Sequence, residues 1–489
     1  MENTPSKVPS PLLSLLPLAV LVGLLFVTIS IWGANALEGA SQVVLLISTA
    51  VCCLIAMLFF DVRWKTIEAS IVNNITGISI ALIILLIIGA LSSSWMISGV
   101  VPTLIYYGVQ IIHPNFFLVS TCIICALVSI VTGSSWTTVA TIGVALFGIG
   151  KVQGFEEGWI AGAIISGAYF GDKVSPLSDT TVLAASVSDV PIFNHIRYLM
   201  ITTIPSMGLA LLIFTIAGFN HQGMDTTHII EFKETLSNAF TISLWLLIVP
   251  VITGILIAKR VPAIITLFTS SILAVLFAII FQPDILSEIS GVTEVSSKSL
   301  FTGSLTALYG STQIETGNAA INDLVSTRGM AGMMNTVWLI LCAMCFGGAM
   351  VASGMLTSII SVFLRFMKNT FGLVSSTVLS GLFFNICTAD QYISIILTGK
   401  MYKETYQKKG YENRLLSRTT EDAVTVTSPL VPWNSCGLTQ STVLGVATLT
   451  YLPYCFFNLI SPLMSMFVAA IGYKIVRTTT PESKDKKQL

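Results

Sequence analysis

The sequence predicts an all-α polytopic membrane protein with an inverted-topology repeat, about ten crossings, two re-entrant hairpins and two broken helices. Composition, apolar runs and an internal repeat are the three observations behind this prediction. Of 489 residues, 54% are hydrophobic and only 10% are charged, and the mean hydropathy is +0.85. Soluble domains carry roughly a quarter charged residues, so the natural partner of this chain is a lipid bilayer.

The charges balance, with 24 Lys and Arg against 24 Asp and Glu. No net field attracts nucleic acid, so no nucleic-acid partner is expected. The nine cysteines sit in or beside apolar runs, where small packing residues are expected and the polar surroundings of a thiolate site are missing. No transition-metal site is predicted.

Eight apolar runs are long enough to cross a bilayer, which takes about 20 residues. They are 12–32, 41–60, 77–98, 196–219, 239–258, 261–281, 334–353 and 453–475. Four further stretches are apolar but interrupted by Gly, Pro, hydroxyls and carboxylates. We expect 116–150 and 371–399 to be re-entrant hairpins, and 159–189 and 419–441 to be broken helices. The stretch 299–333 has no clear place in this scheme.

Basic residues set the predicted sidedness, because short cytoplasmic loops hold an excess of Lys and Arg. The segment 400–418 has six, namely Lys400, Lys403, Lys408, Lys409, Arg414 and Arg418, whereas 33–40, 220–232 and 282–297 have none. Ten crossings with both termini in the cytoplasm satisfy this distribution. His195 and Arg197 open a span on the basic side, where we expect both to be solvated.

An internal repeat links the two halves. At an offset of 255 residues, six positions between Gly99 and Leu127 match Gly354 to Leu382 without a gap, and a two-residue shift aligns Ser175-Pro176-Leu177 with Ser428-Pro429-Leu430. Arg365 and Lys368 stand where the first copy has Gln110 and His113. Equivalent loops therefore lie on opposite sides, which is the inverted repeat of many secondary transporters.

This repeat gives the predicted organisation. Residues 1–60 form N-terminal spans, 61–219 the first repeat, 220–300 linking spans, 301–475 the second repeat and 476–489 a cytoplasmic tail.

Each copy contains two polar breaks in the same order. Thr132–Thr138 reads TGSSWTT, and its counterpart CTADQY (387–392) follows Asn385. A hairpin tip inside protein exposes carbonyls and hydroxyls, the hard oxygen ligands of Na⁺. In this alignment Asp390 corresponds to Ser135.

The second breaks are GDKVSPLSDTT (171–181) and the longer stretch from Glu421 to Asn434. Proline opens these helices, which frees carbonyls for a cation and presents a helix N-terminus to an anion. Charges inside a membrane are costly, so Asp172, Lys173 and Asp179 indicate function. A carboxylate that binds either H⁺ or Na⁺ gives an exchange mechanism directly. Asp390 and Asp422 are weaker candidates, because both can lie near the membrane surface.

At these residues the sequence resembles the NhaC family of sodium/proton antiporters. The resemblance rests on TGSSWTT, GDKVSPLSDTT and TSPLVPWNSCG (427–437), and it extends over nearly the whole chain in span order. It implies a multi-pass protein of the prokaryotic plasma membrane, with inverted repeats and a homodimer whose transport domain moves as an elevator. It also implies that Na⁺ and H⁺ are transported ions and that no cofactor is needed.

Carried onto this sequence, the resemblance implies two cation sites. The first comprises Ser134, Ser135, Thr137, Asp172, Ser175, Asp179 and Thr180. The pseudo-symmetric second comprises Asn385, Thr388, Asp390, Thr427, Ser428, Asn434 and Ser435, with Asp422 as a further cation- or proton-binding candidate. In this alignment Asp179 corresponds to Pro432.

The function predicted from these features is Na⁺/H⁺ exchange. The alternative from the same fold is a Na⁺- or H⁺-coupled carrier of a small organic acid, of malate or lactate type, or of an amino acid, for which Lys173 would supply the counter-charge. A channel is disfavoured because the sequence has no filter-like run. An enzyme is disfavoured because there is no catalytic triad, metal cluster or phosphate loop.

Overall fold

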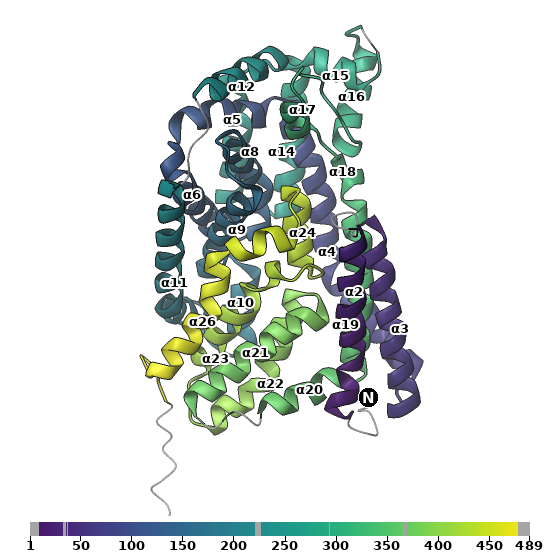
Figure 1. The fold of residues 1–489 in the computed structure, drawn as a ribbon, viewed down its shortest axis with the longest axis vertical. Coiled ribbons are helices and arrows are strands. Elements are labelled where there is room, and N and C mark those ends of the chain that lie inside the picture. The colour runs from purple at the N-terminus through teal and green to yellow at the C-terminus, as the bar shows by residue number, and fades with distance from the viewer. Residues whose placement is uncertain are drawn as a thin grey trace, which may run out of the picture.

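The computed structural model describes residues 9–32, 36, 38–220, 226–292, 294–364, 367 and 369–477, and they form a helical molecule (Figure 1). Apart from two isolated bridges, Thr312 with Thr327 and Tyr411 with Arg477, these residues contain no β-structure. Nine helices in the described part are long and apolar enough to cross a membrane, or up to eleven if two bent pairs count as spans. The all-α polytopic prediction is confirmed. Three of the nine helices, Pro114–Thr132, Ser135–Val152 and Thr370–Thr388, belong to the two predicted hairpins, so the ten crossings stay a prediction.

The first half of the chain begins with helices at the predicted runs 12–32, 41–60 and 77–98, and with one helix, Val100–Ile111, that was not predicted. They are α1 (Pro11–Ser14), α2 (Leu16–Trp32), α3 (Ala40–Phe60), α4 (Trp64–Ile97) and α5 (Val100–Ile111). The first polar region then comprises η2 (Pro114–Phe116), α6 (Phe117–Thr132), α7 (Ser135–Thr138), the π-helix η3 (Val139–Gly143), α8 (Val144–Val152), α9 (Glu157–Val174) and α10 (Asp179–Val187). The long α11 (Ile192–Asn220) closes this half.

The middle of the chain links the halves and includes the stretch that the sequence left unplaced. It comprises α12 (Thr226–Ala239), η4 (Leu244–Leu247), α13 (Ile248–Ala258), α14 (Ala263–Phe281) and α15 (Pro283–Ile289). Residues 299–333 form most of α16 (Ser297–Tyr309), then α17 (Ala319–Val325) and α18 (Gly329–Gly332). α16 packs on α15 and α4. This stretch is therefore a series of short helices and not one long span.

The second half repeats the pattern of the first. It comprises α19 (Met334–Ala352), α20 (Met355–Leu364), α21 (Thr370–Thr388), α22 (Gln391–Lys408), α23 (Asn413–Thr420), the π-helix η5 (Glu421–Thr425), η6 (Ser428–Leu430), α24 (Ser435–Leu444), α25 (Thr448–Tyr451), η7 (Leu452–Tyr454) and α26 (Phe456–Ile471). The predicted break at 419–441 is therefore a π-helix, a 3₁₀ turn and a gap before α24.

Both predicted hairpins are helix–break–helix units whose two ends meet. In the first, Gln153 after α8 donates to the carbonyl of Ile112 after α5, at 2.7 Å. In the second, the hydroxyls of Thr370 and Tyr411 lie 2.6 Å apart. Figure 1 shows α5 and α8 at the upper end of the molecule and α20 and α22 at the lower end. The hairpins therefore enter from opposite ends, as an inverted repeat requires.

The predicted inversion also used Arg365 and Lys368, which lie outside the described residues. The described surface is rich in exposed Leu, Ile, Val and Phe, for example Phe26, Leu58 and Ile280. Such side chains face lipid tails without cost, whereas a water-soluble protein rarely exposes so many of them.

Candidate cation-binding site

The two hairpin tips have the same hydrogen-bond network. In the first tip the Thr132 hydroxyl donates to the Ser134 carbonyl at 3.2 Å and lies 3.2 Å from the Thr138 hydroxyl. In the second tip the Thr388 hydroxyl donates to the Asp390 carbonyl at 3.0 Å and lies 2.8 Å from the Ser394 hydroxyl. We call Thr132–Thr138 tip one and Thr388–Ser394 tip two.

This network corrects the register of the repeat at the tips by one residue. Ser134 and Asp390 both cap the helix that follows, each accepting from the backbone amide three residues on. Asp390 is therefore the counterpart of Ser134, and its predicted match to Ser135 is wrong. The preceding residues, Gly133 and Ala389, both have left-handed backbones, with φ of 66° and 58°.

A similar correction applies at the second breaks. Ser178 caps α10 and Asn434 caps α24, so Asp179 and Ser435 hold equivalent first positions of the helices. The predicted match of Asp179 to Pro432 is wrong because the second copy has three extra residues, Val431 to Trp433, before its cap.

A cavity of about 550 Å³ lies between tip one, the first break, α4 and the loop between α13 and α14. Six of the seven residues predicted for the first cation site line it, together with two residues of tip two. These are Ser134, Ser135, Thr137, Asp172, Asp179 and Thr180, and Gln391 and Tyr392. The sequence identified the polar break of tip two, but not that its first helical residues reach the cavity of tip one.

Asp172 is the best-fixed carboxylate of this cavity. It is 6% exposed, and its Oδ2 accepts from the backbone N–H of Ser135 at 3.1 Å and from the Ser135 hydroxyl at 2.7 Å. Ser135 is the first residue of α7, so the positive end of a helix faces the carboxylate. The end of α9 and tip one are thereby held together by a charge-assisted contact.

Several other lining residues offer oxygen atoms, and Arg260 adds a positive charge to the lining. Asp179, the first residue of α10, is exposed to the cavity, and the neighbouring Thr180 hydroxyl lies 3.0 Å from that of Ser178. The Thr137 hydroxyl donates to the Ser134 hydroxyl oxygen at 3.1 Å. Two carboxylates and several hydroxyls are a donor set for a hard cation, and they lack the thiolates and imidazoles that transition metals select.

Ser175 does not line the cavity. It is fully buried, and its hydroxyl donates to the Ile130 carbonyl at 2.8 Å, which fastens the first break to α6.

Most of the residues predicted for the second site do meet in a buried network, whereas the Ser428 hydroxyl donates to the Thr425 carbonyl and to Gln391 of the cavity wall. Asn385 donates to the Val424 carbonyl at 2.7 Å and to the Thr427 hydroxyl at 3.0 Å. The Ser435 hydroxyl donates to Asp390 at 3.1 Å. All seven are at most 3% exposed, and the cavity described above has none of them in its lining. They are Asn385, Thr388, Asp390, Thr427, Ser428, Asn434 and Ser435.

Lys173 and Asp422 form a fully buried ion pair away from the cavity. Lys173 follows Asp172 in α9, and successive helical residues point about 100° apart. Its ammonium group therefore turns away from the cavity and binds both Asp422 and the hydroxyl of Ser461, the latter at 2.9 Å. A substrate in the cavity would not find this cation free.

Two expectations about basic residues are wrong. His195, expected to be solvated, is fully buried with its Nδ1 2.8 Å from the Ser417 hydroxyl. Arg418, counted among the loop cations, is also fully buried, on the last turn of α23. Both face neighbouring helices, α23 and α11, a pairing that no local sequence signal reveals. Arg197 is exposed, as expected.

Comparison with known proteins agrees with this architecture. A family model for the Na⁺/H⁺ antiporter family matches residues 167–473, which include the first break and the whole second half. The Na⁺/H⁺ antiporter NhaC of Bacillus subtilis is 35% identical over 418 residues, covering 85% of this chain and 89% of that protein.

The chain belongs to the NhaC family of Na⁺/H⁺ antiporters.

Further relatives show the range of the family. The NhaC antiporter of Alkalihalophilus pseudofirmus is 36% identical over 430 residues, covering 87% of this chain and 90% of that protein. A malate-2H⁺/Na⁺-lactate antiporter of Bacillus subtilis is 35% identical over 427 residues, with coverages of 87% and 88%. The NhaC resemblance seen in the sequence is thus confirmed.

Proposed function

We propose that this protein exchanges Na⁺ for H⁺ across a bacterial plasma membrane, with Na⁺ bound in the cavity between tip one and the first break. The observation that carries this proposal is the pair Asp172 and Asp179 in one cavity, with Asp172 held by Ser135. Ser134, Thr137 and Thr180 complete the oxygen-rich wall.

The exchange follows from competition for one negative charge. A carboxylate in this cavity has its charge neutralised either by a proton or by Na⁺, so the two ions exclude each other. Return of the empty, charged carboxylate through the membrane is costly. The site therefore changes the membrane side that it faces only when it holds Na⁺ or H⁺. The flux of Na⁺ is thus coupled to an opposite flux of H⁺.

The first test is transport by purified protein in proteoliposomes with an internal pH dye. An imposed Na⁺ gradient should move protons with no other solute present. The same vesicles should be tested with malate, lactate and amino acids. If no protons move until an organic solute is added, the protein is a coupled carrier and the proposed Na⁺/H⁺ exchange is wrong.

Asp172→Asn tests the site itself. The variant keeps the shape of the side chain and removes its charge, so Na⁺-dependent proton movement should fall at least about 100-fold, by analogy with the loss of a charged partner in a binding site. Asp189→Asn is the matched control, because Asp189 pairs with Lys403 outside the cavity and is exposed. Wild-type exchange by Asp172→Asn would remove Asp172 from the site.

We also propose the predicted sidedness, with both termini in the cytoplasm, and an assembly of two copies. The clustering of basic residues in 400–418 supports the first proposal, and the family resemblance supports the second.

A further inference from the structure

A second cluster of buried charges lies beside the cation cavity but outside it. Lys173 of α9, Arg418 of α23, and Glu421 and Asp422 of the π-helix η5 are all 0% exposed. Each buried ion costs several kcal/mol unless charges and hydrogen bonds compensate it. The partners of these four groups therefore decide which of them carries a charge.

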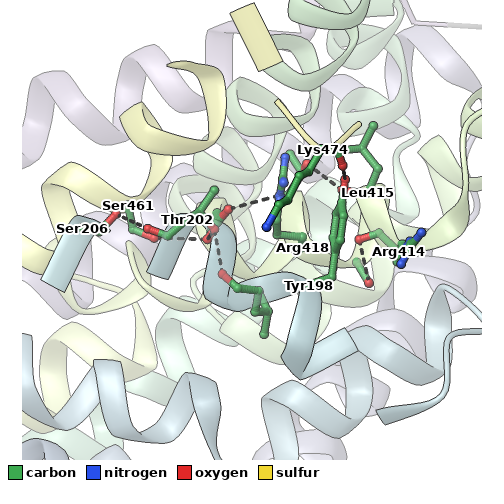
Figure 2. Close-up of polar contacts among 12 residues, drawn as sticks. Tyr198, Thr202, Ser206, Arg414, Leu415, Arg418, Ser461 and Lys474 are labelled. Carbon is green, nitrogen blue, oxygen red and sulfur yellow. Dashed lines mark hydrogen bonds and ion pairs between the residues drawn. The ribbon is translucent and has the colours of Figure 1, made fainter. Parts of the chain in front are cut away.

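One carboxylate oxygen of this cluster, Oδ1 of Asp422, accepts hydrogen bonds from three side chains. Asp422 Oδ1 accepts from the Lys173 ammonium group, from Thr202 at 3.1 Å and from Ser461 at 3.2 Å. The pair thus ties α9 of the first repeat to η5 of the second, with α11 and α26 contributing the hydroxyls. Figure 2 shows Thr202 and Ser461 at this contact.

Arg418 and Glu421 are left without such partners. None of the guanidinium nitrogens of Arg418 and neither carboxylate oxygen of Glu421 makes a hydrogen bond with any described residue. Arg418 lies 4.8 Å from the ring centre of Tyr198, as Figure 2 shows, and its Nε is 3.9 Å from Asp422 Oδ2. Burial without hydrogen bonds favours the neutral, protonated form of a carboxylate over its charged form.

A partner for the charged form of Glu421 is close by on the same helix. Arg418 precedes it by three residues, a spacing at which helical side chains meet. The π-helix starts at Glu421, and such segments are frequent at functional sites and allow a turn to rearrange. Loss of the proton would therefore turn Glu421 toward Arg418, which would give Glu421 a charged partner and Arg418 a second one beside Asp422.

The charges facing Glu421 connect it to the cation cavity. Lys173, Asp172 and Asp422 act on it electrostatically, and the side chain of Thr425, at the end of η5, lies near its carboxylate. Of the other elements packed on η5, α10 carries Asp179, α22 follows its cap Asp390 and carries Glu404 and three lysines toward its far end, and α21 and α26 have no charged residue. Compared with the empty cavity, in which Asp172 is charged, Na⁺ bound at Asp172 cancels a negative charge near Glu421. Charging of Glu421, which releases its proton, then costs less.

We propose that Glu421 is a proton-carrying site of the exchanger, separate from the cation cavity, with Arg418 as the partner of its charged form. This inference rests on the proposed Na⁺/H⁺ exchange and adds one proton per cycle to those carried at the cavity.

The test is the ratio of protons to sodium ions. Purified protein in proteoliposomes is exposed to opposing Na⁺ and pH gradients at a clamped membrane potential, and the zero-flux condition gives the ratio. In Glu421→Gln, Na⁺/Na⁺ exchange should stay within about three-fold of wild type, and the ratio should fall by one proton. Glu412→Gln is the control, because Glu412 pairs with Arg414 and is one-third exposed, and it should keep the wild-type ratio.

A second variant keeps the proposal testable if the first variant does not fold. Glu421→Gln removes the proposed partner of Arg418, whereas Arg418→Gln combined with Glu421→Gln removes both members of the proposed pair and should show the same lowered ratio. An unchanged ratio in either folded variant would overturn the proposal, as would loss of Na⁺/Na⁺ exchange in both. Wild-type protein that couples no protons to Na⁺ would instead overturn the proposed function.

Discussion

Neighbouring residues on one helix turn have different roles in this protein. Asp172 faces the cavity and Lys173 faces the opposite repeat, although they share the last turn of α9. Bulk water does not reach the Lys173–Asp422 pair, because both side chains are 0% exposed. Removal of one partner leaves the other charge buried and uncompensated, which is more costly than removal of both.

Lys173→Met should therefore destabilise the protein by about 3–5 kcal/mol, seen as a lower unfolding temperature in detergent. Lys173→Met combined with Asp422→Asn should recover most of this loss. Lys403→Met, at a partly exposed ion pair, should change the unfolding temperature little. If the single and double variants unfold at the same temperature, Lys173 does not stabilise the fold through Asp422.

The hairpin tips are the elements that place the site. Gly133 ends α6 with φ of 66°, and a Cβ there would lie 2.7 Å from the backbone carbon of Leu177 in the first break. The tip and the break thus touch backbone to backbone, which holds Ser135 against Asp172. In tip two, Ala389 takes the same left-handed conformation with a side chain, so the close approach and not the conformation alone requires glycine at position 133.

We expect Gly133→Ala to weaken Na⁺ binding about ten-fold and to slow exchange. The left-handed backbone costs an alanine about 1–2 kcal/mol, and the added Cβ must push tip one away from Leu177. Equilibrium binding of ²²Na⁺ to purified protein measures this effect. Gly254→Ala in α13 is the control, since a Cβ there meets nothing within 4 Å, and equal affinities for the two variants would show that the contact does not set the site.

At the scale of the whole molecule, the two hairpins enter from opposite ends and their tips share one cavity. Tip two contributes Gln391 and Tyr392 to the wall that tip one forms. Displacement of either repeat therefore changes the same cavity. The sidedness of the chain fixes which membrane face each hairpin enters from.

Single-cysteine labelling tests this sidedness. Lys408→Cys, at the end of α22, should react with an impermeant maleimide only from the cytoplasmic side. Ser237→Cys, on α12 at the other end of the molecule (Figure 1), should react only from the outside. Eight native cysteines are buried and Cys345 is partly buried, so background labelling should be low. Reaction of both positions from one side would contradict the proposed topology.

The sequence by itself determined the fold class, the positions of the spans and the places where helices open. Twenty apolar residues in a row have few stable states other than a membrane helix, and Pro176 and Pro429, each beside further polar residues, mark places where helices open. The sequence also identified Asp172, Asp179 and tip one as candidate site residues, because polar groups are costly in apolar surroundings.

Only the tertiary structure decided which of these groups meet. Lys173 and Asp422 are far apart in the sequence yet form a pair, and Arg418, which resembles a loop cation in the sequence, is buried beside Tyr198. Helix packing brings distant positions together through shape and rotation about the helix axis, which composition and local pattern do not encode. The buried network of the second repeat and the position of Glu421 outside the cation cavity both arise from this packing.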